Sequence, residues 1–204
     1  MMRPEISIGL ARRSDVVEIA SLSRDLIEMG LRWSWTPRRV AASVRNPTAI
    51  VVVARAVGRL AGFGIMRYGD DEAHLDLLGV DHAYRREGLG RRLVEWLEKP
   101  ALVAGISAVF LEVRGSNHGA QAFYQRLGYR AVAQIPHYYQ GRESAMRMGR
   151  ELGSTDRSAS DVWTGLPEWP RGRISGKTAP SGFATASSAR GNIFMKNTDV
   201  SDRG

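Results

Sequence analysis

Three strand-forming runs follow one another with only short turns between them. Ala49–Arg55, Leu60–Tyr68 and Ala73–Val80 are rich in β-branched and other apolar residues, which favour strands. Gly58 and the Gly69–Asp71 segment are typical turn signals. Strands joined by connections this short pair antiparallel with their neighbours, so this part of the chain is predicted to form a meander.

A helix follows the meander and leads to a further strand. Leucines recur at every fourth position of Gly88–Glu98, which is helical spacing, and Pro100 is expected to end or kink this helix. Ser107–Val113 is again strand-like. A strand, a helix and a second strand in this order predict one crossover and hence a sheet with a parallel pair.

The N-terminal part predicts a strand and two helices. Ile6–Leu10 alternates like a short strand. Asp15 is expected to cap a first helix, with Glu18 completing a capping box and Gly30 suiting its end. Pro37 occupies the favoured first position of a second, short helix.

The C-terminal part of the domain predicts a helix and a closing hairpin. Asn117 is expected to cap a helix that ends at Leu127, and Tyr129–Tyr139 pairs with Glu143–Arg150. The full order is β-α-α-β-β-β-α-β-α-β-β. It predicts an α/β (α+β) domain over residues 1–150, with a mixed sheet covered by helices on both faces.

Composition changes after residue 150. Gly, Ser, Thr and Pro supply 23 of the last 54 residues, so residues 151–204 are predicted to form a disordered tail. Trp163, Leu166 and Trp169 leave open a short docking segment instead. The longest uncharged apolar stretch, Pro100–Leu111, is too short to span a membrane, and a cytoplasmic location is expected.

The absence of cysteine excludes disulfides, thiolate metal sites and a cysteine nucleophile. The net charge of +8 favours anionic ligands, which include phosphorylated cofactors, acidic peptides and RNA. No nucleic-acid-binding motif accompanies the charge, so nucleic acid is disfavoured as a partner. No metal is expected.

The strongest single motif is Arg85-Arg86-Glu87-Gly88-Leu89-Gly90, placed where a strand gives way to a helix. A helix start has unpaired N–H groups and partial positive charge, and glycines let the backbone approach a phosphate. No Gly-Lys-Ser/Thr follows, so it is not a P-loop, and Leu93 replaces the third glycine of the dinucleotide fingerprint. The motif alone would equally suit an ordinary glycine-started helix.

Together with downstream segments, this motif resembles the acetyl-CoA signature of the GNAT superfamily. Those segments are Leu111–Asn117, Ala122-Phe123-Tyr124 and Leu127-Gly128-Tyr129. Within the superfamily the chain is most similar to the bacterial ribosomal-protein alanine N-acetyltransferases, which also share the Tyr138-Tyr139 hairpin. The similarity covers about residues 5–150.

The resemblance implies a mostly antiparallel, splayed sheet of six to seven strands with about four helices, open between the Ala73–Val80 and Ser107–Val113 strands. It implies acetyl-CoA as co-substrate and a primary amine as acceptor. The residues expected to bind acetyl-CoA are Leu78, Gly79, Val80, Arg85, Arg86, Glu87, Gly88, Leu89, Gly90, Arg91 and Asn117.

The resemblance also implies two catalytic residues. Tyr124 matches the acid that protonates the leaving thiolate, and Glu112 matches the base that deprotonates the amine. Tyr124 could instead be a core aromatic, and Glu112 could point only to solvent. His74 and Asp76 are expected on the same strand face as Leu78 and Val80, and either could be the base instead.

The acceptor is left open between a protein N-terminal amine and a small-molecule amine. Its pocket would involve Arg32, Trp33 and Trp35 with His137, Tyr138 and Tyr139, although the tryptophans could instead pack against the core. A non-catalytic acetyl-CoA sensor or interaction module on the same fold is the alternative of another class, and a homodimer is a further open partner.

Overall fold

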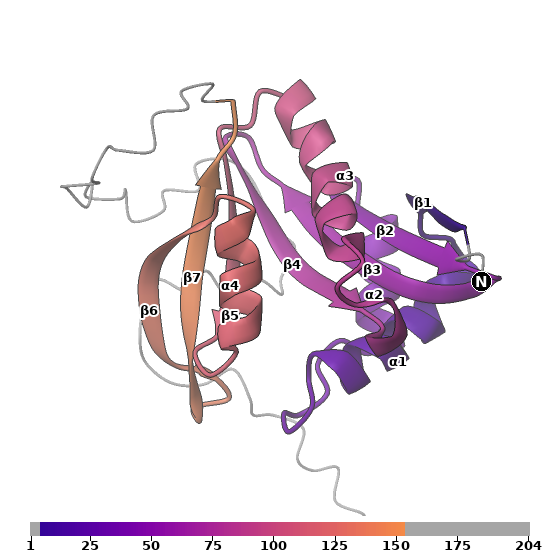
Figure 1. Cartoon of the computed structure of the whole chain (residues 1–204), viewed down its shortest axis with the longest axis horizontal. Helices are drawn as coiled ribbons and strands as arrows, with labels where there is room; N and C mark the ends of the chain where they lie inside the picture. The colour runs from indigo at the N-terminus through magenta and orange to yellow at the C-terminus, as the bar shows by residue number, and fades with distance from the viewer. Residues whose placement is uncertain (1–4, 154–204) are drawn as a thin grey trace, which may run out of the picture. The chain divides into compact units, whose positions relative to one another are not determined.

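The computed structural model describes residues 5–153, which contain seven strands and four α-helices (Figure 1). The strands are β1 Ile6–Leu10, β2 Ala49–Ala56, β3 Arg59–Tyr68, β4 Glu72–Val80, β5 Ala108–Arg114, β6 Arg130–Tyr139 and β7 Glu143–Glu151. They form one sheet in the order β1-β2-β3-β4-β5-β7-β6. Only β4 and β5 pair in parallel, so the mixed, mostly antiparallel sheet is confirmed.

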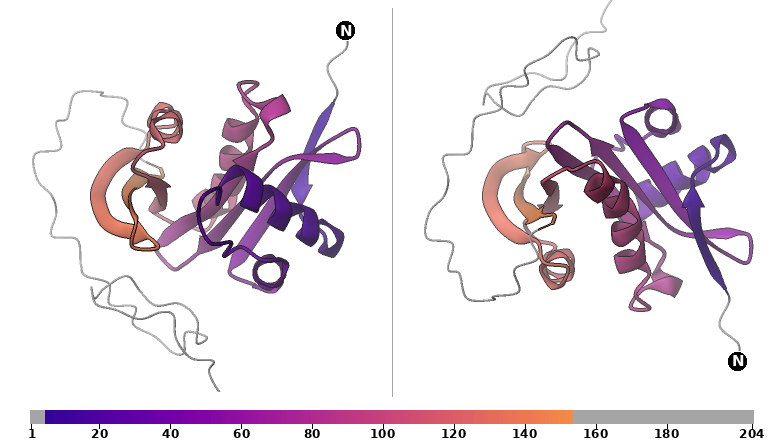
Figure 2. Two further views of the ribbon diagram at one scale, coloured as in Figure 1. Left: turned by 90° about the horizontal axis from the view of Figure 1, so that it is seen from below. Right: turned by 90° about the horizontal axis from the view of Figure 1, so that it is seen from above.

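Helices cover both faces of the sheet, as predicted. They are α1 Val16–Leu26, α2 Pro37–Arg45, α3 Leu89–Val103 and α4 His118–Arg126. Helices α1 and α2 lie on one face, and α3 and α4 lie on the other (Figures 1 and 2). Two further short 3₁₀ turns, Arg13–Asp15 and His82–Tyr84, precede α1 and α3.

Each face of the sheet has its own apolar core, because side chains alternate along every strand. Val52 and Met66 pack toward α3 and α4, whereas Val53, Phe63 and Ile65 pack toward α1 and α2. The two faces are referred to below as the α3 face and the α1 face.

The sheet is split along its middle. Strands β4 and β5 pair only where Glu72–His74 meets Ala108–Phe110, and beyond these residues no pairing continues. Figure 1 shows the two strands together at one end and apart at the other. The splayed sheet that the resemblance implied is therefore confirmed. Beyond His74, those peptide groups of β4 that do not bond to β3 are left facing the opening.

A buried carboxylate of α3, which packs on β2–β4, is bonded to the β5–β7 part of the structure at the closed end of the split. Glu98 of α3 is only 4% exposed. It accepts a hydrogen bond from the Tyr129 hydroxyl at 2.8 Å and pairs with Arg150 of β7 at 2.9 Å. Both carboxylate oxygens thus have partners, as a buried charge requires.

The helix boundary predicted at Glu98 is wrong, because α3 continues through Val103 with Pro100 inside it. A proline at this position removes one backbone hydrogen bond. Burial of Ala101, which is fully inaccessible, favours continuing the helix, and Gly105 with φ +75° provides the stop that proline does not.

The capping box predicted for α1 is also wrong. The Asp15 carboxylate accepts the Arg12 N–H and pairs with Arg55 of β2 instead of capping the helix. Glu18 accepts the Leu60 N–H at 3.2 Å. Both acidic groups therefore tie the start of α1 to the sheet rather than to the helix itself.

Most of the predicted tail, including Trp163, Leu166 and Trp169, lies outside the described residues. Within residues 5–153, no helix has both the length and the apolar character needed to cross a membrane.

Gly79 is predicted to be indispensable for packing. A Cβ added there would lie 2.5 Å from the ring of Phe63, whereas a Cβ added at Gly9 would meet nothing within 4 Å. We expect Gly79→Ala to lower the free energy of unfolding by roughly 1–3 kcal/mol and Gly9→Ala to change it by less than about 0.5 kcal/mol. Urea denaturation measures both. Equal stability of the two variants would show that the Phe63 ring yields freely.

Candidate active site

The open edge of β4 presents backbone hydrogen-bonding groups to the split. The Asp81 N–H donates to the Ala61 carbonyl of β3 at 2.9 Å, and Gly79 pairs with Phe63. Because successive residues of a strand direct their peptide groups to opposite sides, those of Leu78 and Val80 face away from β3. They point toward the side from which β5 has diverged.

A β-bulge changes which way the side chains of β4 face. The pairing of β3 with β4 shifts between Ile65 and Met66, so that Asp76 is the extra residue. Leu75 packs on the α3 face and Leu77 on the α1 face, although strict alternation would place them together.

The bulge overturns one prediction about the candidate bases. Leu78 and Val80 pack on the α3 face, as do the neighbours of His74 in β4. His74 therefore faces α1, opposite to Leu78 and Val80, and the expected shared face is wrong. Glu112 also faces α1, because the flanking residues of β5, Leu111 and Val113, pack on the α3 face.

Five charged side chains form a continuous chain of contacts on the α1 face, the charged network. Arg67 binds both oxygens of Asp76, at 2.5 and 2.6 Å. His74 Nδ1 lies 2.8 Å from Asp76 Oδ1, and its Nε2 lies 2.7 Å from Glu112 Oε2. Arg147 completes the network, 3.6 Å from Glu112 Oε1. The three candidate bases of the sequence are thus brought together rather than separated.

The network fixes the protonation of its members. Burial by itself lowers the pKa of His74, but hydrogen bonds to Asp76 and Glu112 outweigh it and raise that pKa to about 9. Burial would raise the pKa of Asp76 and of Glu112, yet His74 and the nearby guanidinium groups hold both below their ordinary values. At neutral pH the unit is an imidazolium between two carboxylates.

Two tyrosines of β6 adjoin the network. The Tyr139 hydroxyl donates to the Glu112 carbonyl at 3.3 Å. Burial, with the negative charge of Glu112 second, raises the pKa of Tyr138 to about 12. The predicted placement of Tyr138 and Tyr139 beside the site is thereby observed.

Tyr124 lies on the other face of the sheet. It is 8% exposed and packs edge-on against Phe123 and Tyr129, with ring centroids 5.0 and 5.5 Å away. Burial raises the pKa of its hydroxyl, so it holds its proton over the physiological range. Tyr124 is therefore packed among aromatic side chains on the α3 face, whereas Glu112 lies on the α1 face of the sheet.

The glycine-containing motif folds as a loop that enters α3. Arg86 and Gly88 adopt positive φ angles of 62° and 77°, and a Cβ on Gly88 would meet nothing within 4 Å. Gly90 has a different role, because a Cβ there would lie 3.1 Å from the Phe123 ring. The Arg85 Nε donates to the Val80 carbonyl at 3.0 Å, which joins the loop to the end of β4.

Asn117 caps α4 as predicted. Its Oδ1 accepts the Ala120 N–H at 3.0 Å.

Sequence reasoning missed Arg67 and Arg147, since an arginine at an alternating strand position usually points to solvent. Neither residue type nor spacing distinguishes them; the signal lies in their register opposite His74 and Glu112.

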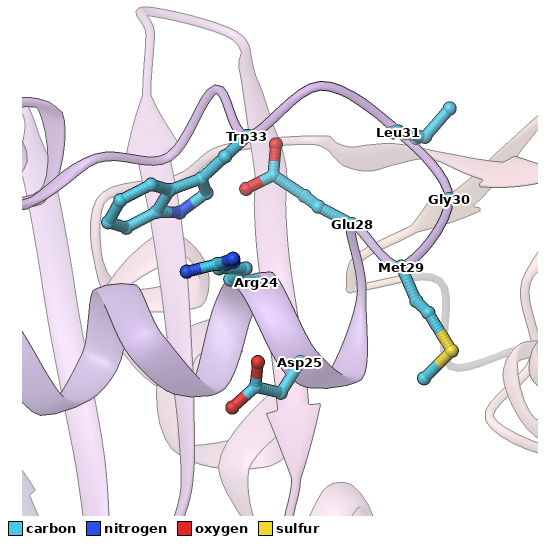
Figure 3. Close-up of a pocket in the computed structure, with 7 residues that line it drawn as sticks. All are labelled: Arg24, Asp25, Glu28, Met29, Gly30, Leu31 and Trp33. Carbon is cyan, nitrogen blue, oxygen red and sulfur yellow. The ribbon is translucent and has the colours of Figure 1, made fainter.

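The loop between α1 and α2 borders the α1 face of the site. The buried Glu28 organises it by accepting the Ser34 N–H at 2.8 Å and the Trp35 N–H at 3.1 Å. Trp35 belongs to the core, whereas Trp33 and Arg24 line a shallow pocket together with Glu28 (Figure 3).

This loop is tied to the closing hairpin. The Gln140 side chain accepts the Arg32 N–H and donates to the Arg32 carbonyl, both at 3.1 Å. Arg114 Nη2 also donates to the Met29 carbonyl at 2.9 Å.

Among residues 5–153, no group of three or more His, Asp or Glu side chains is arranged to hold a metal ion.

Comparisons with known proteins agree on one family. The model of the acetyltransferase (GNAT) family matches residues 18–129. The ribosomal protein bS18-alanine N-acetyltransferase of Escherichia coli K12 is 40% identical over 94 residues, which are 45% of this chain and 64% of that protein. The chain thus spans less than two thirds of that relative.

Two further comparisons extend over more of the chain. The N-alpha-acetyltransferase RimI of Mycobacterium tuberculosis is 33% identical over 153 residues, which cover 72% of this chain and 94% of that protein. The crystal structure of the Escherichia coli ribosomal-protein-S18-alanine N-acetyltransferase superposes with a TM-score of 0.65 at 27% identity, covering 77% of this chain and 100% of that one. The chain described here belongs to the acetyltransferase (GNAT) family.

Proposed function

We propose that this protein is an N-acetyltransferase that transfers an acetyl group from acetyl-CoA to a primary amine in a ternary complex. The observation that carries the proposal is the free edge of β4. The peptide groups of Leu78 and Val80 face the split in the sheet, directly beside a glycine loop at a helix start.

The residues of this edge and loop fit acetyl-CoA. The open space around Gly88, the unpaired N–H groups of the first turn of α3 and the nearby Arg86 and Arg91 suit a diphosphate. We propose that Leu78, Gly79 and Val80 contact the pantetheine arm, that residues 85–91 hold the diphosphate, and that Asn117 contacts the cofactor beyond its capping bond. Bound acetyl-CoA supplies the acetyl thioester.

Glu112 is the proposed general base. Asp76 already accepts a bidentate contact from Arg67 and a further contact from His74. Each ring nitrogen of His74 lies against a carboxylate, Nδ1 against Asp76 and Nε2 against Glu112. The Arg147 contact to Glu112 Oε1 is the longer one, at 3.6 Å, and the Tyr138 hydroxyl also hydrogen-bonds the Glu112 carboxylate. Glu112 is therefore held less tightly than Asp76, and it is the carboxylate proposed to accept a proton from the acceptor ammonium. His74 would then be a positioning residue that orients Glu112 through Oε2.

Two further groups are proposed to act on the acetyl thioester rather than on the amine. The Val80 N–H is oriented into the split and is the proposed donor to the developing oxyanion. Tyr124, protonated and largely shielded from water, is the proposed source of the proton for the departing sulfur.

A protein N-terminal amine is the proposed acceptor. Two relatives are named for N-terminal or alanine N-acetylation, and the α1–α2 loop and the hairpin border the α1 face as two walls joined through Gln140. An extended peptide end suits such a site. A small-molecule amine is the alternative that an acceptor panel would reveal. A cytoplasmic location and a homodimer stay predictions.

Tyr124→Phe is expected to lower turnover by roughly 10²–10⁴-fold while acetyl-CoA affinity stays near normal, because only the transferable proton is lost. Thiol release and calorimetry measure the two quantities. Tyr129→Phe is the matched control, since its hydroxyl binds Glu98 and has no role in proton transfer. Turnover in Tyr124→Phe equal to that of the wild type would remove Tyr124 from the acid role.

Glu112→Gln is expected to reduce kcat by a similar factor of roughly 10²–10⁴, with a steeper dependence on pH as the acceptor amine must then lose its proton unaided. Glu143→Gln, on the neighbouring strand, is the control and should retain activity. If Asp76→Asn abolished turnover and Glu112→Gln spared it, the base would be assigned to Asp76.

The charged network makes stability depend on pH. The folded-state pKa of His74 is raised from 6.5 to about 9, so its stabilisation is fully present below pH 6.5 and is lost as pH rises through about 9. We expect His74→Gln to be less stable than wild type at pH 6 by on the order of 2–3 kcal/mol, with the difference shrinking toward pH 10. Denaturant titrations at several pH values measure it. As a control for the substitution itself, His118→Gln changes an exposed histidine of α4 and should show only a small difference in stability at pH 6.

A further inference from the structure

The α1 face of the proposed site holds more positive than negative charge. Four cations face it: Arg39 of α2, Arg67, Arg147 and the His74 imidazolium. The carboxylates within electrostatic range are Asp76, Glu112 and Glu28.

Each of these carboxylates already has direct partners. Asp76 binds Arg67 and His74, and Glu112 binds His74 and Arg147. Glu28 is buried and takes its hydrogen bonds from the α1–α2 loop. The negative charges of the site are therefore satisfied from within the protein.

Arg39 is the cation without such a partner. It makes no ion pair with any carboxylate in the described part of the chain, although Asp76 and Glu28 both act on its charge from a distance. Its guanidinium carbon lies 3.9 Å from the centroid of the Trp35 ring. Trp35 is held in the core, so this contact positions the guanidinium, while Arg39 itself is exposed to solvent.

The position of Arg39 relates it to the proposed base. Asp76 and Tyr138 are both in its electrostatic range, and Asp76 connects to Glu112 through the single imidazole of His74. One ring and two hydrogen bonds correspond to a span of roughly two residues of extended peptide. An acceptor that has its amine at Glu112 and runs past His74 toward Asp76 would bring its second or third side chain into the electrostatic range of Arg39.

We propose that Arg39 binds a carboxylate of the acceptor, and that the preferred acceptor is a peptide with Asp or Glu at the second or third position behind its N-terminal amine. This inference rests on the proposed acetyltransferase function and names the acceptor class. Polycationic amines are disfavoured by the same excess of positive charge. A planar guanidinium suits a carboxylate through two parallel hydrogen bonds, which a lysine cannot reproduce.

Two short peptides that differ only in charge test the proposal: Ala-Asp-Asp and Ala-Asn-Asn followed by one common sequence. The proteins are the full-length wild type, Arg39→Gln, Arg39→Lys and, as the control, Arg38→Gln, which removes an equal charge from the adjacent exposed residue of α2. We expect wild type and Arg38→Gln to acetylate the acidic peptide with a kcat/KM roughly tenfold or more above the neutral one. Arg39→Gln should lose the preference, with the acidic-peptide kcat/KM falling to that of the neutral peptide.

Other outcomes separate this inference from the function on which it rests. Equal kcat/KM for both peptides in wild type, or a preference that survives in Arg39→Gln, overturns the role of Arg39 and leaves the acetyltransferase intact. If neither peptide is acetylated although acetyl-CoA binds, the proposed protein acetylation fails. Fluorescence anisotropy of the same peptides, labelled at their C-termini, with coenzyme A present then decides the inference: an Arg39-dependent preference for the acidic peptide supports it, and its absence overturns it.

Discussion

The early end of pairing between β4 and β5 is the constraint on which the rest of the structure depends. Parallel strands normally share their full length, but here the ladder stops at His74 and Phe110. The peptide groups of Leu78 and Val80 consequently have no strand opposite them, and a substrate arm can take the place of one. Burial of Glu98 between Tyr129 and Arg150 compensates by holding the halves together at the closed end.

The bulge at Asp76 has an equally direct effect on chemistry. By adding one residue to β4, it places His74 on the α1 face while Leu78 and Val80 pack on the α3 face. Glu112 of β5, which lies just beyond the last paired residue, Phe110, reaches His74 with its side chain. In the proposed reaction, the same strand would serve an acceptor on one face and a thioester in the split.

The sequence allowed the element order, the hairpin and the glycine loop to be predicted, because periodicity, turn residues and helix starts are local signals. It did not reveal the bulge, since a one-residue shift in pairing depends on β3 as well as β4. For the same reason Arg67 and Arg147 went unrecognised: Arg67 binds the bulge residue Asp76, and Arg147 pairs with Glu112, which is distant from it in the sequence. The end of α3 was predicted too early, at Pro100, because burial of Ala101 outweighs the one hydrogen bond that the proline removes.

Gly90 has a consequence for how the site opens. Its backbone lies so close to the Phe123 ring that even a methyl group would be crowded, and Val80 is a near neighbour of the same point. Helix α3 belongs to one half of the sheet and α4 to the other, so this contact sets the separation of the two halves at the wide end of the split. The mouth of the site therefore has a preset width in the protein alone. In the proposed reaction, the thioester would enter a gap whose width is set by this contact within the protein, beside Tyr124, which packs against Phe123.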